Sequence, residues 1–147
     1  MKHQKNLLDE IHGQFSLEQR DVRRYSPLAL AYLGDAVYEI IIRTLIVESK
    51  PGVVKDLHNR SSRLVNAGAQ AALMSAIEGS LTEDETAVFK RGRNAKPHSV
   101  AKHAELHDYH VATGLESLVG YLYLENKMDR CLELIRQGLS SLPDTPF

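Results

Sequence analysis

The feature that most constrains this chain is an apolar stretch with one acid near its middle, Ser26-Pro-Leu-Ala-Leu-Ala-Tyr-Leu-Gly-Asp-Ala-Val-Tyr-Glu39. Ser26 is a favoured N-cap and Pro27 suits the first helical position, so a helix is expected from here to about Glu48. Removing an ionised aspartate from water is costly unless it is paired or bound to a metal. Asp35 is therefore either a solvated or salt-bridged acid on a narrow polar stripe, which the periodicity alone favours, or a metal ligand in a catalytic cleft.

The rest of the chain also predicts helices, with no alternating strand pattern and no repeat. Residues 1–25 are polar and mixed in charge, and they predict an N-terminal arm or a short helix. Further helices are expected at about 54–78, 82–93, 104–124 and 128–142, with an exposed loop over 94–103 and a frayed end over 143–147. Gly34 inside the first helix indicates close approach by another backbone or by a ligand. The expected fold class is all-α.

Composition narrows the functional classes. The 147 residues suffice for one domain, and the formal net charge of −1 gives no global signal for nucleic-acid binding, so any such function must depend on local patches. Cys131 is the single cysteine, which excludes an intrachain disulfide. The N-terminus has no apolar core of a secretory signal, and no apolar run reaches the ~20 residues of a membrane span. We expect a soluble, cytoplasmic protein with no membrane partner.

A second embedded acid, Glu116, lies in a similar apolar segment that also contains glycine. Two carboxylates on two helices are the minimum protein set for Mg²⁺, which takes its other ligands from water and phosphate. The alternative is that each acid pairs with a basic neighbour: Asp35, Glu39 and Arg43 follow one another at i, i+4 spacing. Glu116 has no basic residue three or four positions away, which favours a metal or a partner on another helix.

Basic residues gather in Lys90-Arg-Gly-Arg-Asn-Ala-Lys96, and others precede them over 55–63. A solvated helix end explains such a run about as well as nucleic-acid binding does. A glycine between arginines, however, would let the backbone approach a phosphate closely. The candidate RNA-binding residues are Lys90, Arg91, Arg93, Asn94, Lys96, His58, Arg60 and Arg63.

The histidines of residues 98–110 do not make a convincing zinc site. His103 and His107 have the i, i+4 spacing of a zinc pair, but the glutamate between them is one place late for the His-Glu-x-x-His order. We interpret them as surface residues.

Two motifs together resemble the catalytic domain of the ribonuclease III family. Leu33-Gly-Asp-Ala-Val37 precedes Leu115-Glu-Ser-Leu-Val-Gly-Tyr-Leu-Tyr-Leu124 by about 80 residues, in the family's order, with Tyr32 where the family has phenylalanine. The resemblance covers about residues 26–140. The Ala-Tyr before Gly34, the segment 56–65 and the segment 90–96 are similar to the short bacterial Mini-ribonuclease III branch, as is a length that leaves no room for a double-stranded-RNA-binding domain.

The resemblance implies that residues 26–142 form a homodimeric catalytic domain that cleaves double-stranded RNA. Asp35 and Glu116 would be catalytic and would hold Mg²⁺, with Mn²⁺ as a substitute, while Glu39 and Thr113 support them and Tyr32 contacts the second copy. The implied substrate is the stem of precursor 23S ribosomal RNA, with a ribosomal protein as a further candidate partner. Ala31 and Thr113 depart from the wider family, which has acids at both positions, so this metal site is reduced.

Two other functions remain open at this stage. A non-catalytic RNA-binding protein with the same fold, associated with the ribosome, would explain the missing acids at Ala31 and Thr113. A small all-α metal hydrolase acting on nucleotides would explain Asp35 and Glu116 but would leave the basic segments without a role.

Overall fold

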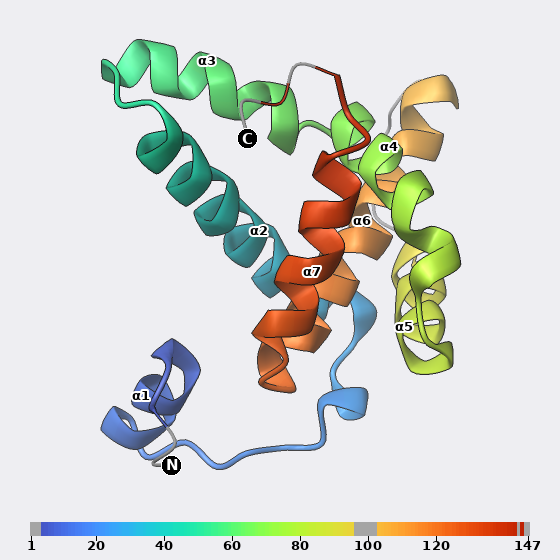
Figure 1. The fold of residues 1–147 in the computed structure, drawn as a ribbon. Helices are drawn as coiled ribbons and strands as arrows, with labels where there is room; N and C mark the ends of the chain where they lie inside the picture. The colour runs from blue at the N-terminus through green and yellow to red at the C-terminus, as the bar shows by residue number, and fades with distance from the viewer. Residues whose placement is uncertain (1–3, 96–102, 144, 146–147) are drawn as a thin grey trace.

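The computed structural model describes residues 4–95, 103–143 and 145, and these residues contain helices and no strand (Figure 1). The all-α prediction is confirmed. In chain order the helices are α1 (Leu7–Gln14), α2 (Pro27–Ser49), α3 (Val54–Val65), α4 (Ala67–Ile77), α5 (Glu83–Asn94), α6 (His103–Leu124) and α7 (Met128–Leu139). Short 3-10 turns occupy Val22–Arg24 and Glu78–Ser80.

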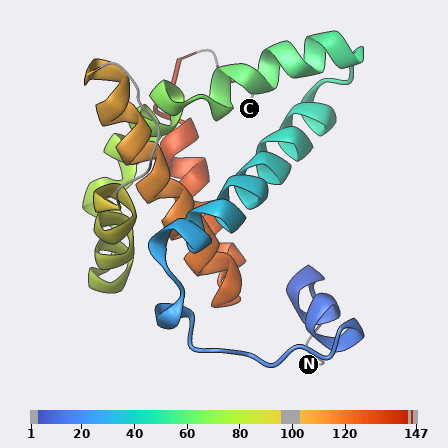
Figure 2. The ribbon, with the colours of Figure 1, turned by 180° about the vertical axis from the view of Figure 1, so that it is seen from behind.

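Helix α6 is the centre of the fold and packs against α2, α4, α5 and α7. Its buried side chains Leu115, Leu118 and Leu122 join those of α2 and α4 in one hydrophobic core. Helix α2 extends outward from this body, and α3 begins at its far end and runs back toward α4, so that α2 and α3 form an open V (Figures 1 and 2). The two views also show α1 at the edge of the molecule, connected to α2 by an extended segment.

Capping residues begin the helices where the sequence predicts them. The Ser26 hydroxyl accepts a hydrogen bond from the Ala29 N–H at 3.1 Å, which satisfies one free donor at the start of α2. At α5, Thr82 and Glu85 form the reciprocal capping box, with hydrogen bonds of 2.9 and 3.2 Å. Both predicted helix starts are confirmed.

The single helix predicted over 54–78 is wrong, because Asn66 divides it into α3 and α4. Asn66 has extended backbone angles, and its side-chain oxygen accepts from the Ala69 N–H at 2.8 Å to cap α4. Its amide nitrogen donates to the carbonyl of Ser62 at 2.9 Å, and the Tyr38 hydroxyl donates to the carbonyl of Leu64 at 2.8 Å. These bonds satisfy carbonyl groups that a continuous helix would have used, so the break costs little.

Other boundaries differ less. Helix α7 ends at Leu139 and not at 142. The predicted loop over 94–103 and the frayed end over 143–147 fall largely outside the described residues. Within the described part of the chain, no helix is both long and apolar enough to traverse a bilayer.

Candidate active site

Helices α2 and α6 cross at two glycines, Gly34 and Gly120. A Cβ atom added to Gly34 would overlap the Glu116 carbonyl oxygen and lie 2.7 Å from the Glu116 carbonyl carbon. A Cβ added to Gly120 would overlap the Leu30 carbonyl oxygen and lie 2.9 Å from the Leu30 carbonyl carbon. Only glycine permits backbones to approach this closely. The approach predicted at Gly34 is therefore confirmed, and the approaching group is the backbone of α6.

The crossing places the carboxylates of Asp35 and Glu116 in direct contact. Glu116 is half-buried, and its pKa is raised to about 8, first by burial and then by the hydrogen bond and the charge of Asp35. The nearby charge of Glu39 raises it further, whereas a hydrogen bond from Gln70 opposes the shift. Two acids in contact thus share a site in which both cannot readily be ionised.

Asp35 itself is exposed, which corrects the expectation of a buried acid at this position. Its apolar sequence neighbours suggested burial, but several of them lie on the same outward face of α2. Tyr32 is 85% exposed and Ile40 is 61% exposed. The apolar surroundings of Asp35 in sequence are thus partly a surface of this chain.

The carboxylates of Asp35 and Glu116 are suited to bind a divalent cation. Within the described residues, neither Asp35 nor Glu116 forms an ion pair, and no lysine or arginine is among the groups that shift the pKa of Glu116. A cation bound by both carboxylates would supply the missing charge. The described residues contain no cluster of three or more potential metal-binding side chains, so the remaining ligands would come from water and phosphate, as Mg²⁺ prefers.

The residues expected to support the site occupy different positions. Glu39 forms an i, i+4 ion pair with Arg43 at 2.9 Å, as the sequence spacing predicts. Thr113 is buried, and its hydroxyl donates to the carbonyl of Tyr109 at 2.9 Å. Ala31 is also buried. Ala31 and Thr113, at the two positions where the wider family has an acid, therefore offer no free metal ligand here.

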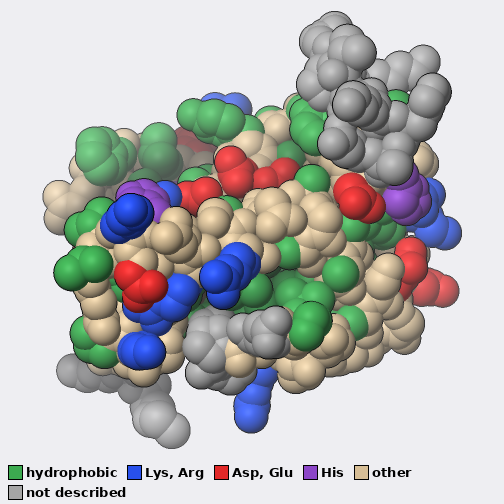
Figure 3. Space-filling model, turned by 90° about the horizontal axis from the view of Figure 1, so that it is seen from above, with side chains coloured by type: hydrophobic (Ala, Val, Ile, Leu, Met, Phe, Trp, Pro, Cys, Tyr) green, Lys and Arg blue, Asp and Glu red, His purple; other side chains and the backbone are tan. Residues whose placement is uncertain are grey.

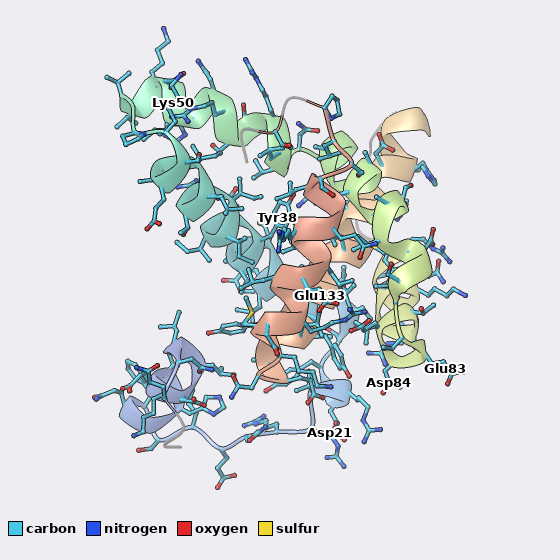
Figure 4. All side chains as sticks on the ribbon, in the orientation of Figure 1. Asp21, Tyr38, Lys50, Glu83, Asp84 and Glu133 are labelled. Atoms are coloured by element: carbon cyan, nitrogen blue, oxygen red, sulfur yellow. The ribbon has the colours of Figure 1, made fainter. Side chains whose placement is uncertain are left out.

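Two buried residues beside Glu116 were not predicted from the sequence. Tyr38 of α2, labelled in Figure 4, is fully buried, and its pKa is raised by that burial and then by the Glu116 charge. Gln70 of α4 is 4% exposed and hydrogen-bonds Glu116. Gln70 could have been found from sequence, because it is a long polar side chain inside the apolar run Ala67–Ile77, the same anomaly that drew attention to Asp35.

The basic residues of α5 are only partly free. Lys90 and Arg91 are exposed. The Arg93 guanidinium lies 5.5 Å from the centre of the Phe89 ring, and its Nε donates to Asn94 at 3.3 Å. Gly92 is buried against Ser117 and Gly114 of α6, so its small size serves helix packing and not the approach of a phosphate, contrary to the expectation.

On α3, His58 and Arg63 are exposed, whereas Arg60 is engaged within the chain. The Arg60 side chain is 16% exposed, pairs with Asp56 at 3.1 Å and donates to the carbonyl of Lys50 at 2.6 Å. Lys96 lies outside the described residues. Acidic side chains gather in the middle of the face seen in Figure 3, with histidines toward both ends.

Comparison with known proteins identifies the class that this fold and this pair of acids define. Residues 28–127 match the ribonuclease III domain family. The chain therefore belongs to the ribonuclease III family, a family of endoribonucleases.

Individual relatives indicate the branch of the family to which the chain is most similar. A Mini-ribonuclease 3 of Enterococcus faecalis is 47% identical over 86% of this chain and 97% of its own length. A Mini-ribonuclease 3 of Thermoanaerobacter is 38% identical over 96% of this chain and 99% of its own length. A crystal structure of a Fusobacterium nucleatum protein superposes with a TM-score of 0.69 at 32% identity, covering 80% of this chain and 93% of that one. The predicted resemblance to the Mini-ribonuclease III branch is confirmed.

Proposed function

We propose that this protein hydrolyses phosphodiester bonds in double-stranded RNA in a reaction that depends on Mg²⁺ or Mn²⁺. The observation that carries the proposal is the glycine crossing of α2 and α6, which holds Asp35 near Glu116, while neither acid forms an ion pair within the described residues. A structural role alone does not explain why Glu116 is buried beside a second acid, because both burial and Asp35 disfavour its ionised form.

Each acid has a distinct part. Asp35 is exposed and reaches the substrate side of the site, whereas Glu116 lies beneath it at the helix crossing. A divalent cation held there would neutralise charge on the incoming phosphates and would lower the pKa of a water molecule for attack. Asp35 and Glu116 would hold that cation, and Glu39, held by Arg43, adds negative charge that favours it.

The proposed RNA footprint uses the exposed basic residues on both sides of the acids. Lys90 and Arg91 on α5, with His58 and Arg63 on α3, are free to contact phosphates and 2′-hydroxyls. A-form RNA is bound largely by shape and by these groups across its shallow minor groove. As the substrate we propose precursor 23S ribosomal RNA, which the resemblance to the Mini-ribonuclease III branch implies.

Cleavage of a long RNA duplex in the presence of Mg²⁺ tests the proposal. Asp35→Asn and Glu116→Gln should each lower the cleavage rate by at least about a hundredfold while the variants still bind RNA, and Glu48→Gln, an exposed acid on the same helix, should retain wild-type activity. RNA binding without cleavage by the wild type would instead support the non-catalytic RNA-binding protein, which the lack of free donors at Ala31 and Thr113 favours.

A further inference from the structure

Gln70 differs from the other buried polar residues of the described chain in what it contacts. Ser61, Thr113 and Ser117 each donate to a backbone carbonyl, and Glu85 pairs with Arg130 at 2.9 Å. The Ser61 and Thr113 bonds stay within their own helices, and the contacts of Ser117 and Glu85 connect two helices each. Gln70 instead directs its amide to Glu116, a residue of the candidate metal site.

The local structure of α4 places Gln70 for this contact. The helix begins anew at Asn66, and Gln70 lies in its first turns, where α4 packs against α6. The neighbours of Gln70 along the helix include the buried Ala71, Leu73 and Met74. Burying an amide among such residues costs free energy unless the amide is hydrogen-bonded, so the bond to Glu116 is what makes glutamine acceptable here.

The chemistry of the contact is directional. The hydrogen bond from Gln70 lowers the pKa of Glu116 and so favours the ionised carboxylate, which can only accept hydrogen bonds. The Gln70 NH₂ group is therefore the part of the amide that faces it. A donor on one side of the carboxylate restricts its rotation. The close approach of Gly34 on α2 fixes the backbone of Glu116 from the other side.

We propose that Gln70 is a positioning residue that orients the Glu116 carboxylate to bind the divalent cation next to Asp35. The inference builds on the proposed function, because it requires that Asp35 and Glu116 hold a cation. Partners that orient a metal ligand from behind typically contribute about 10–100-fold to metal affinity. Two protein carboxylates leave little redundancy, so the orientation of each matters more.

The test measures the binding of Mn²⁺ alone, without RNA, by electron paramagnetic resonance of the free ion. Gln70→Met retains the approximate size of the side chain and removes the hydrogen-bond donor. It should lower Mn²⁺ affinity by about tenfold or more, and it should raise the Mg²⁺ concentration needed for half-maximal cleavage while leaving the RNA affinity measured without metal unchanged. Met74→Leu, a core substitution on the same helix, should reduce thermal stability at most and leave Mn²⁺ affinity unchanged.

The outcomes separate this inference from the proposed function. Wild-type Mn²⁺ affinity in Gln70→Met, alongside reduced affinity in Asp35→Asn, would overturn the role of Gln70 and leave the metal site standing. Equal Mn²⁺ binding by the wild type and by Asp35→Asn would overturn both. If Gln70→Met does not fold, Gln70→Asn replaces it, because its amide is one methylene too short to reach Glu116, and the same fall in affinity is expected.

Discussion

At the scale of single residues, the contact between Asp35 and Glu116 makes the protein sensitive to pH. Glu116 has a pKa of about 8 in the folded chain, compared with an ordinary value of 4.5, because burial and Asp35 disfavour its ionised form. Below pH 4.5 the group is protonated in both the folded and the unfolded states. Between pH 4.5 and 8 the folded state retains a proton that the unfolded state releases, so the free energy of unfolding falls as pH rises through this window.

Without metal, the wild type should therefore lose stability relative to Glu116→Gln between about pH 5 and pH 8, by at least about 1 kcal/mol, since one pKa unit corresponds to about 1.4 kcal/mol. Urea unfolding with EDTA at fixed protein concentration measures the difference. Added Mg²⁺ at about pH 8 should restore the stability of the wild type and should not stabilise the variant. Parallel pH profiles for the two proteins would show that Glu116 does not have this raised pKa.

The basic residues make a separate prediction at this scale. Lys90 and Arg91 should contribute to RNA phosphate binding because they are exposed, whereas Arg60 should not, because it is engaged with Asp56 and Lys50. Replacing Lys90 and Arg91 by alanine should reduce the slope of log affinity against log salt by roughly 1 for each phosphate that the variant no longer neutralises. Arg136→Ala, an exposed arginine on α7, provides the matched control. An unchanged slope in the double variant would remove α5 from the RNA footprint.

At the scale of helices, the function depends on how closely α2 and α6 approach. Gly34→Ala should separate them, because the new Cβ would overlap the Glu116 carbonyl, a backbone atom that cannot move aside alone. We expect a decrease of about 1–3 kcal/mol or more in the free energy of unfolding and a strong decrease in cleavage, since both acids move apart.

Gly13→Ala offers the control, because a Cβ at this helical glycine of α1 would meet nothing within 4 Å. It should leave cleavage unchanged and alter stability by no more than about 1 kcal/mol. Thermal or urea unfolding together with a cleavage assay measures both effects. A fully active and stable Gly34→Ala would contradict the tight crossing.

The helices also show what the sequence could and could not predict. Helix starts could be predicted where the capping residue lies next to the helix in sequence: Ser26 and Thr82 begin helices as predicted. The break at Asn66 was missed because the apolar period continues through it and because the Tyr38 hydroxyl, far away in sequence, helps to stabilise it. The exposure of Asp35 was missed because an apolar pattern does not distinguish a core from an apolar surface.

At the scale of the whole molecule, the outward face of α2 exposes several apolar side chains. Tyr32 is 85% exposed, Ile40 is 61% exposed and Leu28 is 42% exposed, an apolar surface that isolated soluble chains rarely present. We propose that a second copy covers it by twofold symmetry, which would place two active sites on one RNA duplex.

Sedimentation at micromolar concentration should therefore find the wild type as a dimer and Tyr32→Asp as a monomer. Val53, between α2 and α3, is also apolar and is 72% exposed. The Val53→Asp variant serves as the control and should remain dimeric. A monomeric wild type, or a dimer that persists in Tyr32→Asp, would exclude this face as the interface.

The whole molecule is built around the crossing of α2 and α6, which we propose forms a two-carboxylate metal site from Asp35 and Glu116. The most direct measurement is anomalous X-ray scattering from crystals grown with Mn²⁺, for the wild type and for Asp35→Asn. We expect a manganese peak within coordinating distance of both carboxylates in the wild type, at about 2.0–2.2 Å as for other small divalent cations, and no such peak in the variant. Manganese bound elsewhere, with none between these two acids, would contradict the proposed site.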